Sequence, residues 1–229
     1  MVKGYLPHPD GVIRQEIGKL CIFVGKGPLL RSYYKKNQVE AGCDEAGRGC
    51  LAGPVVAAAV ILPPRYKNKH INDSKQIPER LRGEIAETIK NDALAWAVGV
   101  VSHTEIDEIN ILNASFLAMH RAVDQLKITP EFLLIDGNRF KKYKELDHAC
   151  IIKGDGIYLS IAAASLLAKT HRDDIMLDLH QQFPQYGWDT NKGYPTGAHR
   201  NGISKHGSCE LHRKSFTLLP PQLSLFELG

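Results

Sequence analysis

The string Cys43-Asp44-Glu45-Ala46-Gly47-Arg48-Gly49-Cys50 combines two adjacent carboxylates with a glycine-rich turn that carries an arginine. Two neighbouring anions repel and raise each other's pKa, so burying such a pair is costly unless a cation or strong donors lie between them. Glycine lets backbone N–H groups approach a substrate closely, and Arg48 supplies a positive charge that suits a phosphate. The string therefore indicates a divalent metal site beside a polyanion site. The alternative is a solvated strand end followed by an ordinary turn.

Two further acids follow apolar runs later in the chain. Asp136 ends Leu133-Leu134-Ile135-Asp136, and Asp155 follows Ile151-Ile152-Lys153-Gly154. Taken singly, Asp136 suits a turn and Asp155 suits the cap of a following helix. Together with Asp44-Glu45 they place acids at the ends of three apolar strands, which predicts an oxygen-rich site for a hard cation, Mg²⁺ or Mn²⁺. The sequence has no His or Cys cluster with zinc-ligand spacing.

The elements that must position these acids alternate between apolar strands and helices, which predicts an α/β protein. Strands are expected at residues 39–46, 54–62, 94–102, 132–135 and 149–152. The second strand is apolar almost throughout, so we expect both of its faces to be buried. Helices are expected at residues 78–91, 104–127 and 158–183, the middle one broken near 110–113. The apolar patch at 20–24 suits either a strand or a packed arm.

The composition limits the class of protein and the compartment in which we expect it. The chain has 229 residues, of which 43% are hydrophobic and 24% charged, as in ordinary globular proteins. No apolar run is long enough to cross a bilayer and the N-terminus lacks a signal-type segment, so we expect a cytoplasmic protein without a membrane partner. The five cysteines are odd in number and scattered, which predicts reduced thiols. A net charge of +4 is compatible with a nucleic-acid partner and with many small-molecule enzymes.

Five segments occur in a diagnostic order and spacing. They are Asp44-Glu45-Ala46-Gly47-Arg48-Gly49, Leu133-Leu134-Ile135-Asp136-Gly137, Lys153-Gly154-Asp155, residues 161–169 with Arg172-Asp173, and Lys192-Gly193-Tyr194-Pro195-Thr196. These segments resemble the motifs of bacterial ribonuclease HII, a type 2 ribonuclease H. The resemblance implies a ribonuclease H-like fold, with a mixed central sheet flanked by helices and a helical C-terminal part. It implies an N-terminal extension at 1–38, a catalytic domain at 39–216 and a flexible tail at 217–229.

The resemblance also implies an enzyme, a hydrolase of the hybrid-specific endoribonuclease type. Such an enzyme cleaves RNA in RNA–DNA hybrids and on the 5′ side of a ribonucleotide embedded in duplex DNA, leaving 5′-phosphate and 3′-hydroxyl ends. Its role would lie in DNA replication and ribonucleotide excision repair, and we expect a monomer. Two Mg²⁺ or Mn²⁺ ions about 3.5–4 Å apart would activate a water and stabilise the leaving oxygen. The implied metal-binding and catalytic residues are Asp44, Glu45, Asp136 and Asp155.

A ribonucleotide differs from its neighbours by one hydroxyl, so its recognition requires a donor and acceptor site shaped for the 2′-OH. The resemblance assigns this reading to the backbone of the Gly47-Arg48-Gly49 turn, which moves the turn from phosphate binding to sugar recognition. It assigns packing on the following deoxyribose to Tyr194. It adds phosphate contacts for Lys75 and Lys169. The structural alternatives are a half-buried aromatic ring and solvated lysines.

Four residues in or near the motifs receive other interpretations. Asp173 is interpreted as support for the metal site or for its own helix. Asn191 stands where many relatives of the resembling family carry His, and Gly197-Ala198 precedes His199. We expect these departures to affect the fine geometry of the substrate and to leave the reaction class unchanged.

The end of the chain carries a separate motif. After Pro220-Pro221 comes Gln222-Leu223-Ser224-Leu225-Phe226, which resembles the peptide by which bacterial replication and repair proteins dock on the sliding clamp. A Gln followed by spaced Leu and Phe anchors suits insertion into a preformed apolar pocket. The alternative is a tail that folds back on its own core.

Three other functions stay open on sequence grounds. Ribonuclease HIII shares the fold and the acids, but it differs at the first motif and carries a larger N-terminal domain than the 43 residues before Asp44. Another nuclease or transposase of the same superfamily would keep the acids without the Gly-Arg-Gly and Lys-Gly-Tyr elements. A non-catalytic nucleic-acid-binding module would not need four acids near phosphates, because they repel the ligand unless a metal is present.

Overall fold

The structure, a computed structural model, describes residues 14–17, 20–23, 30–68, 70–71 and 78–220. Its strands are β1 (Arg14–Ile17), β2 (Leu20–Phe23), β3 (Glu40–Ala46), β4 (Val55–Ile61), β5 (Ala95–Val101), β6 (Phe132–Asp136) and β7 (Asp147–Ile151). β1 and β2 form a two-stranded antiparallel sheet, and the others form one sheet in the order β5-β4-β3-β6-β7. β4 runs antiparallel to β3 and β5, whereas β6 and β7 run parallel to β3. The predicted mixed central sheet is therefore confirmed.

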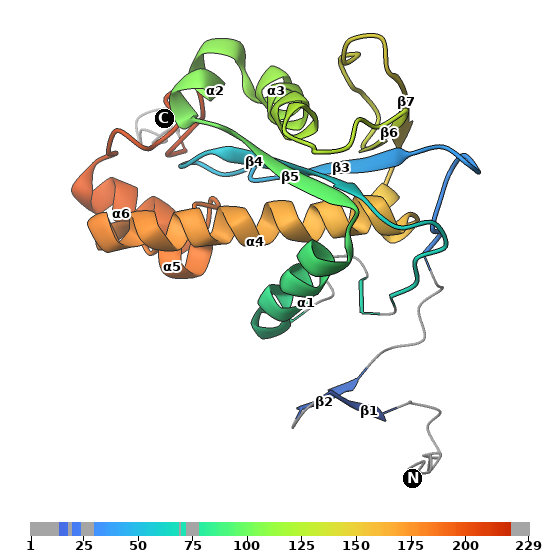
Figure 1. The fold of residues 1–229 in the computed structure, drawn as a ribbon. Helices are drawn as coiled ribbons and strands as arrows, with labels where there is room; N and C mark the ends of the chain where they lie inside the picture. Colours follow the sequence, from blue (N-terminus) through green and yellow to red (C-terminus); the bar gives the residue numbers. More distant parts are fainter. Residues whose placement is uncertain (1–13, 18–19, 24–29, 69, 72–77, 221–229) are drawn as a thin grey trace, which may run out of the picture.

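Helices cover both faces of this sheet. They are α1 (Glu79–Asp92), α2 (His103–Ile109), α3 (Ile111–Asp124), α4 (Leu159–Gln182), α5 (Trp188–Asn191) and α6 (Gly197–His206), with 3₁₀ turns η1 (Gly154–Gly156) and η2 (Pro184–Tyr186). α2 and α3 lie on one face, α4 and α1 lie on the other, and α5 and α6 follow the end of α4 (Figure 1). This arrangement agrees with the predicted α/β architecture, a mixed sheet flanked by helices with a helical C-terminal part. In the part of the chain that the structure describes, none of these helices is both long and apolar enough to cross a membrane.

Alternation along β3 divides the buried side chains between two cores. Cys43 packs on the α3 side of the sheet, and Ala46 packs on the α4 side. Gly42 also faces α4, where a Cβ would lie 2.3 Å from the backbone carbon of Ser160. The missing side chain therefore lets α4 lie against the centre of the sheet, and this close approach brings the middle of α4 to the end of β3.

The predicted strands and helices agree with the structure to within a few residues. The patch at 20–24, for which a strand and a packed arm were both open, forms strand β2. The expected break in the long helix lies at Asn110, where φ is +64° and the side chain accepts hydrogen bonds from the N–H groups of Leu112 and Asn113. One expectation was wrong: Asp155 does not close a strand. β7 ends at Ile151, and Lys153, with a left-handed φ of +56°, turns the chain into η1, which carries Asp155.

The boundary at residue 39 stays a prediction. The segment just before it already contacts the body of the fold, since the N–H of Arg31 donates to the carbonyl of Ile157 over 2.7 Å. Tyr34 stacks on Phe132 with ring centroids 5.7 Å apart. The described thiols are free, as expected; they are Cys43, Cys50, Cys150 and Cys209.

Candidate active site

A pocket of about 300 Å³ opens at the edge of the sheet where β3 and β6 end. It gathers the four predicted acids, the glycine-rich turn, Lys169 and Tyr194, which come from distant segments of the chain. The complete lining is Asp44, Glu45, Ala46, Gly47, Arg48, Gly49, Arg82, Asp136, Asp155, Ser165, Lys169 and Tyr194. Apart from Lys75 and the tail peptide, every residue that the sequence proposed for the site therefore lies in one place.

Parallel pairing of β3 with β6 explains how the acids meet. The register sets Cys43 opposite Ile135, so the next residues, Asp44 and Asp136, lie on neighbouring strands at the same level. β7 pairs with β6 on its other side, and η1 follows β7. The first backbone N–H of η1 donates to Oδ1 of Asp136 over 2.6 Å, which holds Asp155 beside the strand ends.

The acids of β3 lie in an environment that opposes their ionisation. Burial raises the pKa of Asp44 well above its ordinary value, and the negative charges of Glu45 and Asp136 raise it further. Burial also raises the pKa of Glu45, although Arg48 partly offsets this by donating to Oε1 over 3.0 Å. Ser165 on α4 hydrogen bonds to Asp44 and favours its charged form. A cation placed between these groups would relieve the repulsion between them.

The donor set fits a hard divalent cation, because all four side chains offer carboxylate oxygens. Among the described residues, no three His, Cys, Asp or Glu side chains already converge on a single point as metal ligands. The Glu45 carboxylate is turned onto Arg48. Arg48 therefore offsets part of the charge of Glu45 in this arrangement.

The glycine-rich turn has a backbone shape that requires glycine. Gly47 has a φ of +95°, and a Cβ there would lie 2.0 Å from Nε of Arg172. An alanine at this position would face both a left-handed backbone and a buried side chain. The N–H of Cys50 lies 3.4 Å from the carbonyl of Gly47 and closes the turn.

Tyr194 is linked to the segment just after this turn, through the backbone of the preceding Gly193 and through its own side chain. It follows Lys192 and Gly193, both with positive φ, and the N–H of Leu51 donates to the carbonyl of Gly193 over 2.8 Å. The Tyr194 hydroxyl forms a hydrogen bond with the side chain of Cys50. Burial and then Cys50 raise the pKa of the tyrosine, whose side chain is 38% exposed toward the pocket.

The predicted basic contacts have different outcomes. Lys169 lines the pocket, where its ammonium group pairs with Asp173 one turn later on α4. This ion pair gives Asp173 a partner within the site, and its supporting role stays a prediction. Lys75 and the tail residues Gln222, Leu223, Leu225 and Phe226 lie outside the described residues.

Sequence reasoning missed two polar residues of the lining. Ser165 lies within the 161–169 segment that carries the family resemblance, so that segment held a signal for it. Arg82 lies on α1. The charged residues of this helix have the pattern of an ordinary solvated helix face, so nothing in the sequence singled out Arg82.

The departures from the family pattern have clear local roles. The side chain of Asn191 donates to the carbonyl of Tyr186 over 2.7 Å and accepts from the N–H of Gly193 over 2.8 Å. Asn191 therefore fixes the turn that leads to Tyr194. Gly197-Ala198 forms the first turn of α6, directly after Thr196, whose hydroxyl accepts the N–H of His199 and caps the helix.

Comparison with known proteins gives the family. The family model for Ribonuclease HII matches residues 41–219. The chain is 63% identical to Ribonuclease HII of Phocaeicola vulgatus over 199 residues, which is 86% of this chain and 99% of the relative.

Solved structures show the same fold. RNase HII in the PCNA:RNase HII complex from Archaeoglobus fulgidus has 25% identity and a TM-score of 0.67, over 82% of this chain and 99% of that one. Bst-RNase HIII in complex with Mn²⁺ has 19% identity and a TM-score of 0.58, over 79% and 68%. The motifs, the fold and the extent of the family match together assign this chain to the ribonuclease HII family of type 2 ribonuclease H endoribonucleases, rather than to ribonuclease HIII.

Proposed function

We propose that this ribonuclease H cleaves RNA–DNA hybrids, and duplex DNA on the 5′ side of an embedded ribonucleotide, at the pocket where β3 and β6 end. One observation carries the proposal. The carboxylates of Asp44, Glu45, Asp136 and Asp155 share this pocket with the Gly47-Arg48-Gly49 turn and with Tyr194. Groups suited to hydrolysis at phosphorus and groups suited to reading a sugar therefore lie within reach of one nucleotide.

Enzymes of this family depend on divalent metal, and we propose that the four acids hold two Mg²⁺ or Mn²⁺ ions. When bound, such ions lower the pKa of water and stabilise charge on the leaving oxygen. The protein's part is to hold the carboxylates at fixed positions. The bond from η1 to Asp136 and the Ser165 bond to Asp44 serve that purpose. The Mn²⁺ bound by Bst-RNase HIII supports a divalent cation here without deciding between the two metals.

Substrate specificity is proposed to come from the turn and Tyr194. The backbone of the Gly47-Arg48-Gly49 turn would bind the 2′-OH of the ribonucleotide, and the exposed ring of Tyr194 would pack on the next deoxyribose. A ribose there would press its extra hydroxyl against the ring, so the pair would favour a junction between RNA and DNA. Lys169 is proposed to contact the phosphate backbone, since its ammonium lies at the same pocket.

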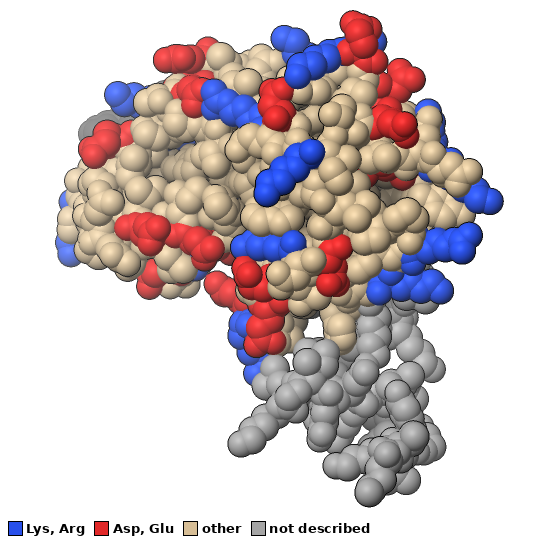
Figure 2. Space-filling view, in the orientation of Figure 1, with Lys and Arg blue, Asp and Glu red and all other residues tan. Residues whose placement is uncertain are grey.

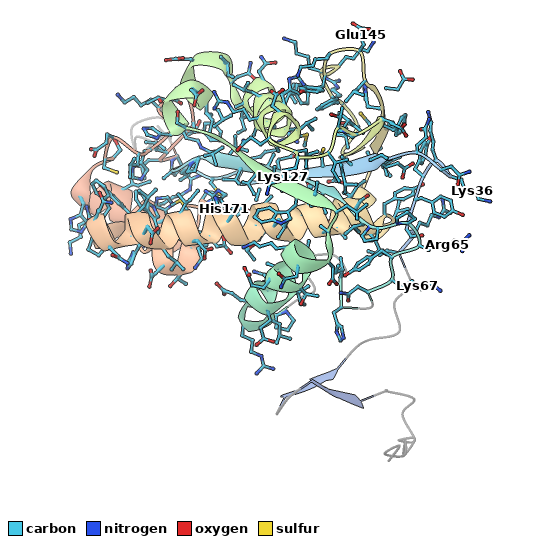
Figure 3. All side chains as sticks on the ribbon, in the orientation of Figure 1. Lys36, Arg65, Lys67, Lys127, Glu145 and His171 are labelled. Carbon is cyan, nitrogen blue, oxygen red and sulfur yellow. The ribbon has the colours of Figure 1, made fainter. Side chains whose placement is uncertain are left out.

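Positive charge that could attract a nucleic acid is found in the lining of the pocket and does not form a broad surface on the face seen in Figure 2. Acidic and basic side chains are interspersed over the face shown in Figure 2, so the net charge does not form one broad basic surface there. Lys36, Arg65 and Lys67 lie at the end of the molecule where β3 begins, away from the pocket (Figure 3). Among the described residues, the cations that line the pocket itself are Arg48, Arg82 and Lys169.

Outside the described residues, the peptide Gln222-Leu223-Ser224-Leu225-Phe226 is proposed to bind the bacterial sliding clamp. The solved complex of the archaeal RNase HII with PCNA supports a clamp partner for this family. The enzyme is proposed to act as a monomer, with a catalytic unit at 39–216 and a tail at 217–229.

One assay tests the proposed reaction. A DNA duplex that contains a single ribonucleotide is incubated with the full-length protein in Mg²⁺, in Mn²⁺ and in a chelator, beside an all-DNA duplex of the same sequence. We expect one cut on the 5′ side of the ribonucleotide in at least one metal, with 5′-phosphate and 3′-hydroxyl ends. Cleavage in the chelator, or cutting of the all-DNA duplex at a similar rate, would contradict the proposal.

A further inference from the structure

Behind the Gly47-Arg48-Gly49 turn lies a guanidinium group that bonds to the turn itself. Arg213 is fully buried, and its Nη2 donates to the carbonyl of Gly47 over 2.7 Å while its Nη1 donates to the carbonyl of Arg48 over 2.9 Å. Its Nε donates to the carbonyl of Gly53 over 3.0 Å. The planar fork of one arginine therefore holds two successive peptide groups of the turn at once, which a lysine cannot do.

The bonds from Arg213 also determine the direction of the N–H groups in the two peptide units whose carbonyls it binds. The described chain has no cis peptide bonds, so the C=O and the following N–H of each peptide point in opposite directions. With the carbonyls of Gly47 and Arg48 directed at Arg213, the N–H groups of Arg48 and Gly49 point away from it. These residues line the pocket that the acids share. Arg213 thus directs two backbone donors of the turn away from itself, on residues that border the pocket.

Arg213 is itself held rigidly by the fold. Its N–H donates to the carbonyl of Leu51 over 2.8 Å, and Asp107 on α2 accepts the N–H groups of Lys214 and Ser215 over 2.8 and 2.9 Å. Burial lowers the pKa of Arg213 to about 10, which leaves the group charged at neutral pH. A buried charge is costly, and here it is compensated by carbonyl dipoles.

A second buried arginine holds the same loop from the α4 side. Arg172 donates to the carbonyl of Pro54 over 3.0 Å and to that of Lys192 over 2.8 Å. It therefore joins the loop after the glycine-rich turn to the segment that carries Tyr194. Arg213 is the residue of the two that bonds directly to Gly47 and Arg48.

We propose that Arg213 is a positioning residue that orients the N–H groups of Arg48 and Gly49 toward the substrate sugar and thereby sets the preference for ribose over deoxyribose. The inference rests on the proposed sugar-reading function of the turn. The inference adds Arg213, which is distant from the turn in the sequence, as the residue on which the turn's selectivity for ribose depends.

The test compares the binding of two duplexes that differ by one hydroxyl. Dissociation constants for a DNA duplex with one ribonucleotide and for the all-DNA duplex are measured by fluorescence anisotropy in Ca²⁺, an oxygen-seeking ion with looser geometry than Mg²⁺. Arg213→Lys keeps the charge but loses the fork, so we expect the ribose preference to fall about tenfold, the worth of one well-placed hydrogen bond. The affinity for all-DNA duplex should stay near that of the parent.

Arg200→Lys is the matched control. Arg200 also donates to backbone carbonyls, those of Thr217 and Leu218, but it does not line the pocket. This variant should keep the full ribose preference. Arg213→Gln, which retains an amide donor, is the second variant if Arg213→Lys does not fold by circular dichroism.

The outcomes separate this inference from the function on which it rests. A parent protein without ribose preference would contradict the sugar-reading role of the turn. A parent with the preference and an Arg213→Lys variant that keeps it would overturn only the role of Arg213. An equal loss in Arg200→Lys, or failure of both Arg213 variants to fold, would make Arg213 a general stability residue and would also overturn the proposal.

Discussion

The backbone N–H of Gly154 donates to Oδ1 of Asp136 over 2.6 Å and so ties the end of β6 to the turn that carries Asp155. The bond gives Asp136 a structural contact in addition to its proposed metal-binding role. An asparagine would keep an oxygen able to accept the same bond while removing the negative charge. The two roles of Asp136 can therefore be separated by one substitution.

Asp136→Asn is expected to lower the cleavage rate by more than about 100-fold while the affinity for the substrate duplex changes little, since removing a metal ligand acts mainly on the transition state. Single-turnover cleavage and anisotropy binding measure the two effects. Asp147→Asn, at the exposed far end of β7, is the matched control and should cleave like the parent. A fully active Asp136→Asn protein would show that the four-acid assignment is wrong.

Tyr194→Ala is expected to lose most of the preference for RNA–DNA junctions, by about tenfold. Complete burial of an aromatic ring is worth roughly 1.5–3 kcal/mol, and a tenfold change corresponds to about 1.4 kcal/mol. Tyr194→Phe removes only the hydroxyl that bonds to Cys50 and should keep most of the preference. Cleavage positions on a hybrid with one junction provide the measurement. Unaltered junction cutting by Tyr194→Ala would rule out the proposed packing on the sugar.

Acid is expected to destabilise the fold through His212, which is fully buried. Burial and the neighbouring His199 lower its pKa to about 4, from 6.5 in the unfolded chain. Its Nε2 lies 3.2 Å from Nε2 of His199, and its Nδ1 faces the N–H of Cys209 at 3.1 Å. Nδ1 must therefore be unprotonated to accept that bond, and a second ring proton would meet a donor.

These two pKa values determine the direction in which the free energy of unfolding changes with pH. Above pH 6.5 the histidine is neutral in both states and its contribution is complete; as the pH falls toward 4, the unfolded chain binds the proton first. The free energy of unfolding should therefore decrease by about 2 kcal/mol from this group between pH 7 and pH 5. Urea unfolding at both pH values measures this. His212→Gln should lose that part of the pH dependence, whereas His206→Gln, at the exposed end of α6, should retain it. Identical pH slopes for the parent and His212→Gln would contradict the assignment.

Two glycine substitutions should change stability in opposite directions. In Gly42→Ala the new Cβ would lie 2.3 Å from the backbone of Ser160, and overpacking of this kind costs about 1–3 kcal/mol. In Gly83→Ala, within α1, a Cβ would meet no atom within 4 Å, and the helix should gain about 0.5–1 kcal/mol. Thermal unfolding of both variants provides the comparison. A stable Gly42→Ala protein would show that α4 does not need this close approach.

Deletion of residues 221–229 is expected to remove binding to the sliding clamp and leave cleavage of the free duplex unchanged. The reason is that the apolar anchors Leu225 and Phe226 would be lost, whereas the pocket lies wholly within the described fold. Surface plasmon resonance with the immobilised clamp measures the first effect. Phe226→Ala should reproduce the loss and Ser224→Ala, between the anchors, should not. A truncated protein with parental clamp affinity would rule out the peptide.

Much of the fold could be predicted because it depends on local pattern. β4 is buried along its whole length, as expected, because every side chain in this strand is apolar and none favours contact with water. The break at Asn110 was visible because the residue types there favour a cap. Asp155 was expected at the end of a strand but lies in the following 3₁₀ turn. The left-handed backbone of Lys153, which ends the extended chain before it, could not be predicted because lysine does not favour that conformation.

Local features of the sequence were enough to predict which acids follow apolar runs, where glycines allow a tight turn, and which family carries these motifs. The position of Asp44 beside Asp136 became known from the fold, because strand register is a property of two paired strands. The tertiary structure alone joined Arg213 to the carbonyls of Gly47 and Arg48. Contacts between residues so far apart depend on packing of the whole fold, and no local pattern encodes them.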